Sequence, residues 1–435
     1  MTSIPQVARA MQTVLTTVAD QAGRDSDFVL RESKLTGSTF VQTLVFGWLA
    51  DPQATLEALA QTAATVGVTI TAQGLDQRFT ETAAACLEQV LAAAVQQVVA
   101  ADPVALPILT RFAAVQVQDS STVSLPAALA DVWFGCADGT AALKVHLGLD
   151  LCTGSLTGPT ISNGCAYDGS VNTPPKLPAG SLRLTDLGYF DLDAFATLAT
   201  QQLYFLSRFK TGTIVQTADG ARLDLLTVLA GEAEGPVDLD VRLGRDGQLA
   251  CRLVALRAPQ EVVDQRRRRL RAEARRRGRT VSAASLALAA WTLLLTNAPP
   301  GRLSATDVLV LARARWQIEL LFKLWKTHGQ IDQSRSEKPW RVLCEVYAKL
   351  VAMLVQHWIL VLNCWCYPDR SLMKAAQTVR QHALQLAWVV RDLLRLEEGL
   401  TLIQHCLAVG CRMNKRKTTP HTYQLLLALS PEPLA

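Results

Sequence analysis

The 435-residue sequence lacks the cysteine and histidine spacings of disulfide-built and zinc-bound folds. Its ten cysteines include no Cys-x-x-Cys pair, and Cys364 and Cys366 have no partners nearby at zinc-ligand spacing. The six histidines show no metal-binding spacing either. We therefore expect free thiols in a reducing compartment, which favours a cytoplasmic protein.

Long uninterrupted hydrophobic runs are also missing, as is a leader-like N-terminus. The first residues, MTSIPQVARAMQTV, contain no basic stretch followed by an apolar run. The most apolar stretch, 346–366, is interrupted by Lys349, Gln356, His357 and Asn363. These polar residues argue against a membrane span, so we interpret the stretch as a buried core helix and expect no membrane partner.

Charged residues are few, at 19%, whereas hydrophobic residues make up 49% of the chain. This composition is typical of a globular protein with enough core for two or three domains. The net charge of +5 is modest, but the segment 266–279 holds nine arginines in fourteen residues. Such a run is either a solvated, self-repelling helix or a surface that contacts a polyanion such as the DNA backbone.

The first 105 residues are predicted to be all-helical, because Ala, Leu, Gln and Val dominate and strand-like alternation is absent. Within them, 54–79 predicts two short helices joined at Gly67, with Thr69 or Thr71 capping the second. This pair is a helix-turn-helix candidate for DNA contact, although plain structural helix pairs share the pattern. Residues 337–435 are predicted to be helical again.

Strand-like segments fill the middle of the chain. One strand is predicted to end at Asp119, the segment 141–151 alternates strictly, and 155–162 follows as a third strand. Two further short strands are expected, one ending at Asp186 and one spanning 204–209.

A separate β-rich patch is expected at 211–258. Turns at 219–220 and 246–247 indicate two hairpins there. A basic helix over 262–279 and a short apolar helix over 284–295 should follow.

The segment 311–329, LARARWQIELLFKLWKTHG, predicts a helix with two different faces. The apolar face consists of Ile318, Leu321, Phe322 and Trp325. The charged face consists of Arg315, Glu319, Lys323 and Lys326. The charged face is either solvated and held by ion pairs along the helix, or it is the wall of a site in which one carboxylate stands among three cations.

Three carboxylates are candidates for a metal site: Asp119, Asp186 and Glu319. The two aspartates end predicted strands, and the sites of α/β folds gather at the carboxyl ends of strands. Mg²⁺ takes oxygen ligands, and a pair of Mg²⁺ ions suits the cleavage and joining of phosphodiesters. Acidic residues at strand ends are common, so their spacing alone does not decide the matter.

A resemblance to a known family rests on Arg315, Glu319 and Lys326, which are separated by three and six residues. RWQIELLFKLWK resembles the Y-R-E-K signature of the IS4-type DDE transposases, the group of the Tn5-type enzymes. VQDSSTVSLP is similar to the first-aspartate motif of that family, and LTDLGYF to its second. The likeness extends from about Phe28 to the C-terminus.

The resemblance implies an α/β protein with an RNase H-like catalytic core, a β-rich insertion and flanking helical regions. The implied ranges are 1–105 for a helical DNA-binding region, 106–210 and 301–370 for the two parts of the core, 211–300 for the insertion with its basic helix, and 371–435 for a helical C-terminal region. By the same analogy Asp119, Asp186 and Glu319 bind two Mg²⁺ ions, for which Mn²⁺ can substitute.

DNA contacts are implied as well. The candidates for phosphate contact are Arg208, Arg315, Lys323 and Lys326. Trp291 is a candidate for stacking on a flipped base, with a core tryptophan as an equal alternative. One departure is plain, since Ala312 stands where the signature has tyrosine and cannot make a phenol's hydrogen bond.

The implied function is that of a DNA transposase that cuts and joins the ends of an insertion sequence. Its partner is double-stranded DNA, on which at least a homodimer would form, in the bacterial cytoplasm and at the nucleoid. Two alternatives stay open: a catalytically impaired DNA-binding relative, which Ala312 favours, and an RNase H-like nuclease without strand transfer.

Overall fold

The computed structural model describes residues 3–31, 34–167, 177–231, 235–418 and 420–429, and the chain divides into two compact units. Unit 1 consists of Met1–Ala105, Asp119–Val171 and Gln317–Lys415, and unit 2 of Leu106–Gln118, Asn172–Trp316 and Arg416–Ala435. The chain passes between the units within strand β1 (Val115–Leu125) and at the start of helix α12 (Trp316–Thr327).

Helices make up the N-terminal part of unit 1. They are α1 (Ile4–Thr13), a π-helical segment (Val14–Val18), α2 (Ala19–Asp25), α3 (Gly37–Ala50), α4 (Leu56–Thr65), α5 (Ala72–Asp76) and α6 (Glu81–Val95). The predicted helical character of this region is confirmed. The α4–α5 pair is present as expected, and the Thr71 side chain caps α5 by accepting a hydrogen bond from the Gly74 amide. Asp76 at the end of α5 pairs with Lys338 and Arg341.

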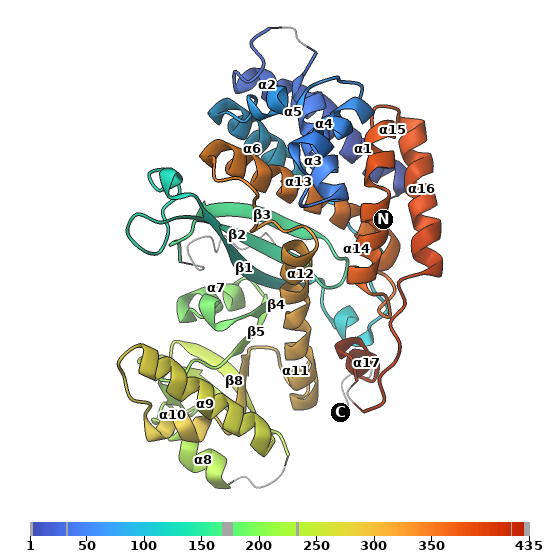
Figure 1. Ribbon diagram of the computed structural model, residues 1–435. Helices are drawn as coiled ribbons and strands as arrows, with labels where there is room; N and C mark the ends of the chain where they lie inside the picture. The colour runs from blue at the N-terminus through green and yellow to red at the C-terminus, as the bar shows by residue number, and fades with distance from the viewer. Residues whose placement is uncertain (1–2, 32–33, 168–176, 232–234, 419, 430–435) are drawn as a thin grey trace. The chain divides into compact units, whose positions relative to one another are not determined.

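Helix α13 (Pro339–Cys364) is the core helix of unit 1. It packs against α3 and α6 (Figure 1). Its length and composition would suit a membrane span, but 94% of its most apolar 18-residue segment is buried inside the protein. The predicted buried helix is therefore confirmed. Helices α14 (Leu372–Gln381), α15 (Ala383–Val389) and α16 (Leu393–Val409) follow it.

The strands of unit 1 lie in the order β3-β2-β1. β2 (Ala141–Asp150) and β3 (Leu156–Asn163) are antiparallel, which confirms both predicted strands. The prediction that β1 ends at Asp119 is wrong, because the strand continues to Leu125. Beyond Asp119 the buried Val123 and Leu125 alternate with exposed residues, so the strand keeps one buried face.

The strands of unit 2 lie in the order β1-β4-β5-β9-β8-β7-β6. Those not yet introduced are β4 (Leu182–Thr185), β5 (Tyr204–Arg208), β6 (Val215–Gln216), β7 (Val237–Leu243), β8 (Leu249–Arg257) and β9 (Trp291–Thr296). β1, β4 and β5 are parallel, and the other pairs are antiparallel. Helix α7 (Leu192–Thr200) adds Phe195 to the core, where its ring stacks on Phe205 at 4.5 Å. The predicted mixed α/β class is confirmed.

The segment 284–295 was expected to be a single apolar helix, and this prediction is wrong. The helix α10 (Ala283–Leu288) is short, and Trp291–Thr296 forms β9, which pairs with β5 on one side and β8 on the other. Short apolar runs suit a buried helix and a buried strand equally, and here two partner strands supply the backbone hydrogen bonds.

The two expected hairpins of the insertion differ in outcome. The turn at 246–247 joins β7 and β8 in register, as predicted. At the turn 219–220 a single bridge links Gln216 and Arg222, and the chain then forms helix α8 (Leu225–Gly231) in place of a second strand. The basic helix is confirmed as α9 (Gln260–Arg276).

The charged helix predicted over 311–329 is present in two pieces, which follow another helix. Helix α11 (Ala305–Leu311) is followed by a 3₁₀ turn (Ala312–Arg315) and then by α12. The last helix of the described chain is α17 (Thr422–Leu427).

Candidate active site

Asp186 directly follows β4, the strand between β1 and β5 in unit 2. Its Oδ1 is buried and has no hydrogen-bond partner among the described residues. Its Oδ2 lies 3.9 Å from Nη1 of Arg315. A buried carboxylate oxygen is costly unless a donor or a cation satisfies it. Asp186 therefore fits the role of a metal ligand.

Two of the predicted phosphate-binding residues, Arg208 and Arg315, line one cavity of unit 2. The cavity has a volume of about 210 Å³, and Arg313 adds a third guanidinium to its wall. Ala312 also lies on this wall. The small side chain at this position thus borders open space that a tyrosine ring would partly fill.

Asp119 lies in unit 1, half-buried on β1. Its Oδ1 accepts a hydrogen bond from the Ser120 amide at 2.8 Å. The polar stretch around it separates the buried first half of the strand from its alternating second half. The local backbone therefore presents this carboxylate at a partly accessible place on the strand.

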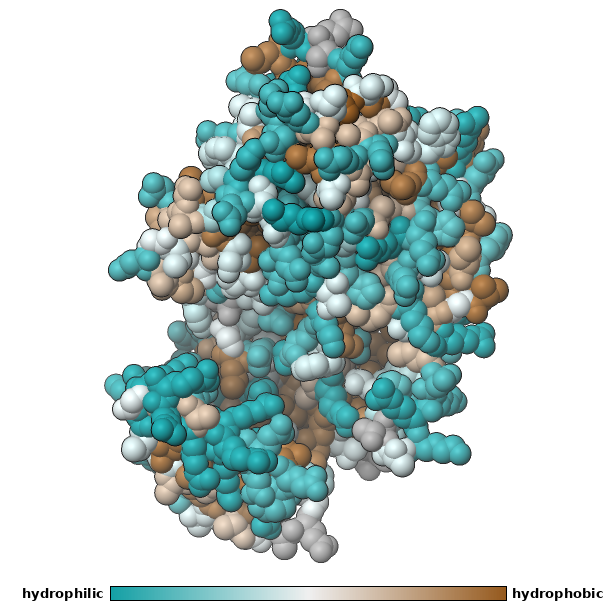
Figure 2. Space-filling model, in the orientation of Figure 1, coloured by the Kyte–Doolittle hydropathy of each residue, from teal (hydrophilic) through white to brown (hydrophobic). Residues whose placement is uncertain are grey.

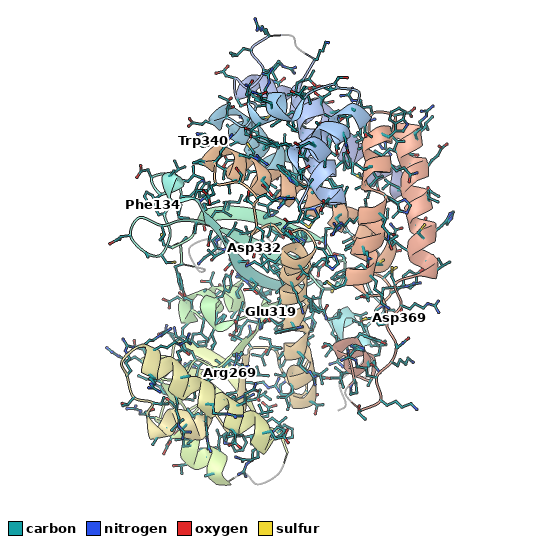
Figure 3. All side chains as sticks on the ribbon, in the orientation of Figure 1. Phe134, Arg269, Glu319, Asp332, Trp340 and Asp369 are labelled. Carbon is teal, nitrogen blue, oxygen red and sulfur yellow. The ribbon has the colours of Figure 1, made fainter. Side chains whose placement is uncertain are left out.

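Glu319 is half-buried in the first turn of α12 (Figure 3). The predicted apolar face of this helix is confirmed, because Ile318, Leu321, Phe322 and Trp325 are all buried. Lys323 is exposed and Lys326 is half-buried. Nζ of Lys326 donates to the Thr122 carbonyl of β1 at 3.3 Å and lies 3.7 Å from Oδ2 of Asp332.

The described residues contain no group of three or more His, Cys, Asp or Glu side chains gathered as a metal site. Within unit 2, Asp186 and Arg315 lie close together, and within unit 1 Lys326 reaches β1 a few residues beyond Asp119. The grouping of Asp119, Asp186 and Glu319 around metal ions stays a prediction.

Trp291 opens β9, opposite Arg257 of β8. Its side chain is half-buried and packs against the hydrophobic core of unit 2. Its carbonyl accepts a hydrogen bond from Nη1 of Arg266 at 2.9 Å. These contacts agree with the alternative of a core tryptophan. That alternative placed Trp291 in an apolar helix, whereas the residue starts a strand.

No structural role was predicted from the sequence for three charged residues: Arg183, Lys349 and Asp332. Arg183 is buried on β4, where it donates to Gln118, and burial lowers its pKa to about 10. Lys349 is buried inside α13 and pairs with Glu345 at 2.7 Å. Arg183 between Leu182 and Leu184, and Lys349 within an apolar helix, were visible as polar residues at buried positions. Asp332 gave no such signal.

Comparison with known families gives a match over more than half of the chain. The family described as "Transposase DDE domain" matches residues 111–355. This range contains Asp119, Asp186, Glu319 and every predicted phosphate-binding residue.

Several curated proteins are similar to this chain. The transposase for insertion sequence element IS231F of Bacillus thuringiensis subsp. israelensis is 25% identical, over 91% of this chain and 89% of its own length. The transposase for IS1151 of Clostridium perfringens is 24% identical over 77% of this chain and 76% of its own length. The putative transposase InsL for IS186A of Escherichia coli is 30% identical over 49% of this chain and 60% of its own length.

Proposed function

Because the chain belongs to the family of the transposase DDE domain, we propose that it cuts and rejoins the ends of an insertion sequence. It is an enzyme of the DDE transposase type with an RNase H-like domain. The observation that carries the proposal is the family match over 111–355, which spans all three candidate carboxylates. The Y-R-E-K spacing supports an IS4-type member, with Ala312 as its departure.

Asp119, Asp186 and Glu319 are the proposed metal ligands, and the family implies a divalent metal. Two features support this set. The Oδ1 of Asp186 is buried and has no hydrogen-bond partner within the described part of the chain, which suits a cation. Asp119 and Asp186 each come two residues after Val117 and Leu184, which pair with each other in the parallel strands β1 and β4. Mg²⁺, with Mn²⁺ as a substitute, would supply an activated attacking oxygen and stabilise the leaving oxygen of a phosphodiester.

The remaining residues of the site would bind and orient DNA. Arg208 and Arg315 line one cavity, so their guanidinium groups suit bidentate contacts to a phosphate there. Lys323 and Lys326 extend the positive charge along α12, and the arginine helix α9 adds a further cationic surface. Phosphate contacts of this kind hold DNA in register and give binding a strong salt dependence.

The proposed partner is double-stranded DNA at the element's ends and at the target, with at least a homodimer bringing two ends together. The domain ranges 1–105, 106–210, 211–300, 301–370 and 371–435 form part of this proposal, as does a nucleoid-associated place in the bacterial cytoplasm. The relatives named as insertion-sequence transposases support the DNA partner.

The test is cleavage of DNA that carries the element's own ends, with Mg²⁺ or Mn²⁺. We expect the wild-type protein to cut these ends and join them to a target, and Asp119→Asn, Asp186→Asn and Glu319→Gln to lose at least a hundredfold in rate while still binding DNA. Removal of the metal with EDTA should abolish cutting by the wild-type protein. Cleavage that survives each substitution would refute the metal assignment.

The same assay separates the alternatives. Ala312 favours a catalytically impaired relative, which would bind the ends without cutting them in either metal. A nuclease without strand transfer would cut the ends and give no joined product.

A further inference from the structure

The loop between α12 and α13 places an acidic residue, Asp332, against Lys326. Nζ of Lys326 lies 3.7 Å from Oδ2 of Asp332 and donates to the Thr122 carbonyl at 3.3 Å. Figure 3 labels Glu319, which lies on the same helix as Lys326, and Asp332 in the loop that follows this helix. The ammonium of Lys326 is therefore held from two sides, by strand β1 and by the loop.

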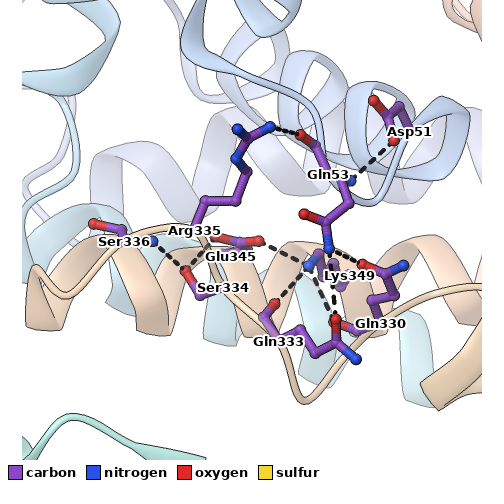
Figure 4. A network of polar contacts seen from close by, with 9 residues as sticks. All are labelled: Asp51, Gln53, Gln330, Gln333, Ser334, Arg335, Ser336, Glu345 and Lys349. Carbon is purple, nitrogen blue, oxygen red and sulfur yellow. Dashed lines mark hydrogen bonds and ion pairs between the residues drawn. The ribbon is translucent and has the colours of Figure 1, made fainter.

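A buried ammonium fixes the backbone of this loop on both sides of Asp332. Nζ of Lys349, which is 1% exposed, donates to the carbonyls of Gln330 at 3.0 Å and Gln333 at 2.8 Å (Figure 4). Glu345 pairs with Lys349 at 2.7 Å and accepts a hydrogen bond from the Ser334 hydroxyl at 2.7 Å. The loop is thus attached to α13 by several partly buried polar contacts, all centred on the buried Lys349–Glu345 pair.

Further contacts restrict the same loop. Ile331 is completely buried, and Gln330 adopts a φ of 45°, a left-handed conformation that non-glycine residues rarely keep without tertiary support. Gln53 bonds the Gln330 side chain, and Arg335 donates to the Gln53 carbonyl at 2.9 Å (Figure 4). Asp332 accordingly stands on a rigid backbone.

The carboxylate of Asp332 is held by this backbone, since its 3.7 Å approach to Lys326 is too long for a hydrogen bond. Its Oδ1 is buried and has no hydrogen-bond partner among the described residues. Burial lowers the pKa of Lys349, and the charges of Glu345 and Asp332 oppose that shift. Asp332 therefore brings negative charge close to both lysines.

We infer that Asp332 is a positioning residue, which orients the Lys326 ammonium toward a DNA phosphate bound on the Glu319 face of α12. This inference rests on the proposed transposase function. A lysine ammonium has three N–H donors. One of them is donated to the Thr122 carbonyl, and the Asp332 carboxylate attracts the ammonium through its charge. The remaining N–H groups are left for phosphate oxygens, because the Lys326 side chain is 35% exposed.

The sequence spacing agrees with this role. Lys326 follows Glu319 by seven residues, so both side chains lie on one face of α12, about 10 Å apart along the helix axis. A lysine side chain is long and flexible, and a fixed carboxylate limits the places its ammonium visits. Such preorganisation matters most in the step where the phosphate must be held in line.

The test is Asp332→Asn, with Asp51→Asn as the matched control. Asp51 carries the same charge and belongs to the same polar network (Figure 4). Among the described residues its ion-pair partner is Arg380 and not Lys326. We expect Asp332→Asn to slow single-turnover cleavage of end DNA at least tenfold. Its Kd for the same DNA should stay equal or become lower, because a negative charge near the phosphate is gone. Asp51→Asn should change neither value.

A double-mutant cycle with Lys326→Met separates positioning from a general effect on folding. If Asp332 acts through Lys326, Asp332→Asn should cause no further loss in the Lys326→Met protein. Asp332→Glu, which keeps the charge, should recover part of the rate. Thermal unfolding of each variant reports whether the loop still folds.

Two outcomes would overturn the inference: an unchanged or faster rate in Asp332→Asn, or an equal loss with and without Lys326. A faster rate with tighter binding would identify Asp332 as a competitor of the phosphate. Wild-type protein that leaves end DNA intact would refute the proposed function, whereas normal wild-type cleavage beside an unaffected Asp332→Asn variant would refute the inference alone.

Discussion

His357 is a buried histidine in the middle of α13, held as a neutral ring. Its Nε2–H donates to the Gly154 carbonyl at 2.8 Å, and its Nδ1 is buried without a partner among the described residues. Burial lowers the pKa of His357 to about 4, and the hydrogen bond to Gly154 offsets only part of this shift. Protonation would place a charge in the core of unit 1.

We predict that this histidine makes the protein acid-sensitive. An unfolded histidine has a pKa of about 6.5, and the lower folded value means that the unfolded state binds more protons. The contribution of His357 is fully present above about pH 6.5 and is lost as the pH falls toward 4, at about 1.4 kcal/mol per pH unit. Urea unfolding at pH 7 and pH 5 should show a loss of about 2 kcal/mol from this residue.

The control is His357→Gln, which keeps an N–H donor for Gly154 and cannot titrate in this range. Its free energy of unfolding should fall less between pH 7 and pH 5 than that of the wild-type protein. An equal fall in both proteins would assign the acid sensitivity to other groups.

Ala312 borders the cavity that holds Arg208, Arg313 and Arg315. We predict that Ala312→Tyr raises the rate of end cleavage roughly tenfold or more, because a hydrogen bond to a charged phosphate contributes about 1.5–3 kcal/mol. The measurement is single-turnover cleavage of DNA carrying the element's ends.

Ala312→Phe is the companion variant, since it fills the same space without a hydroxyl. It should leave the rate close to that of the wild-type protein. Equal gains from Tyr and Phe would show that filling the cavity, and not the hydroxyl, is what matters.

At the scale of elements, the arginines in and directly after α9 fall into two groups: those with partners in the protein and those on an exposed face. Arg266 donates to the Trp291 carbonyl and the Thr292 hydroxyl, both at 2.9 Å, and Arg267 donates to the Leu286 carbonyl at 3.0 Å. Arg277 pairs with Glu273 at 2.9 Å. Arg268, Arg271 and Arg275 are exposed and follow one another at spacings of three and four, which stack on one face. Figure 2 shows the hydrophilic surface over this helix.

We predict that this exposed face binds the DNA backbone independently of sequence. Replacing Arg268, Arg271 and Arg275 by Gln should weaken binding to end DNA and to unrelated duplex DNA alike. Each lost phosphate contact lowers the slope of log K against log salt by about 0.9, so the triple variant should lose about two to three units of slope. Fluorescence anisotropy over a salt series measures this slope.

The matched control replaces three exposed cations of the C-terminal helical region, Lys374, Arg391 and Arg395, by Gln. It removes the same charge and should leave the slope nearly unchanged. A loss of equal size in both triple variants would point to net charge, and a loss confined to end DNA would contradict a sequence-independent contact.

Two elements show where local pattern misleads. The segment 291–296 has apolar residues that suit either helix or strand, and its pairing with β5 and β8 decides for a strand. β1 passes through the polar residues around Asp119 and continues, because Val123 and Leu125 return to the buried face. For 291–296 the deciding contacts come from strands distant in sequence, whereas β1 continues because its own apolar alternation resumes at Val123.

At the scale of the whole molecule, the linear order of segments does not follow the compact units. Unit 1 gathers three separate stretches of chain, and the first part of the family match lies in unit 2. Helix α13 unites the N-terminal helices with the C-terminal ones by packing against α3, α6, α14 and α16. The burial of α13, predicted from its apolar composition, implies tertiary contacts, because the polar side chains of Lys349 and His357 need partners when they are buried.

The sequence by itself determined the helical N- and C-terminal regions, most of the central strands, the two faces of α12 and the family. It could do so because periodicity, turn residues and motif spacing are local properties. The candidate carboxylates and phosphate-binding residues came from the same motifs. Only the tertiary structure decided that Trp291 starts a strand, that Ala312 borders a cavity with three arginines, and that Asp332 stands against Lys326. The first two depend on which distant segments pack together, and the third depends on the contacts that Lys349 and Gln53 make with the loop around Asp332. Tertiary packing decides these features because it sets which side chains are buried and which partners they meet.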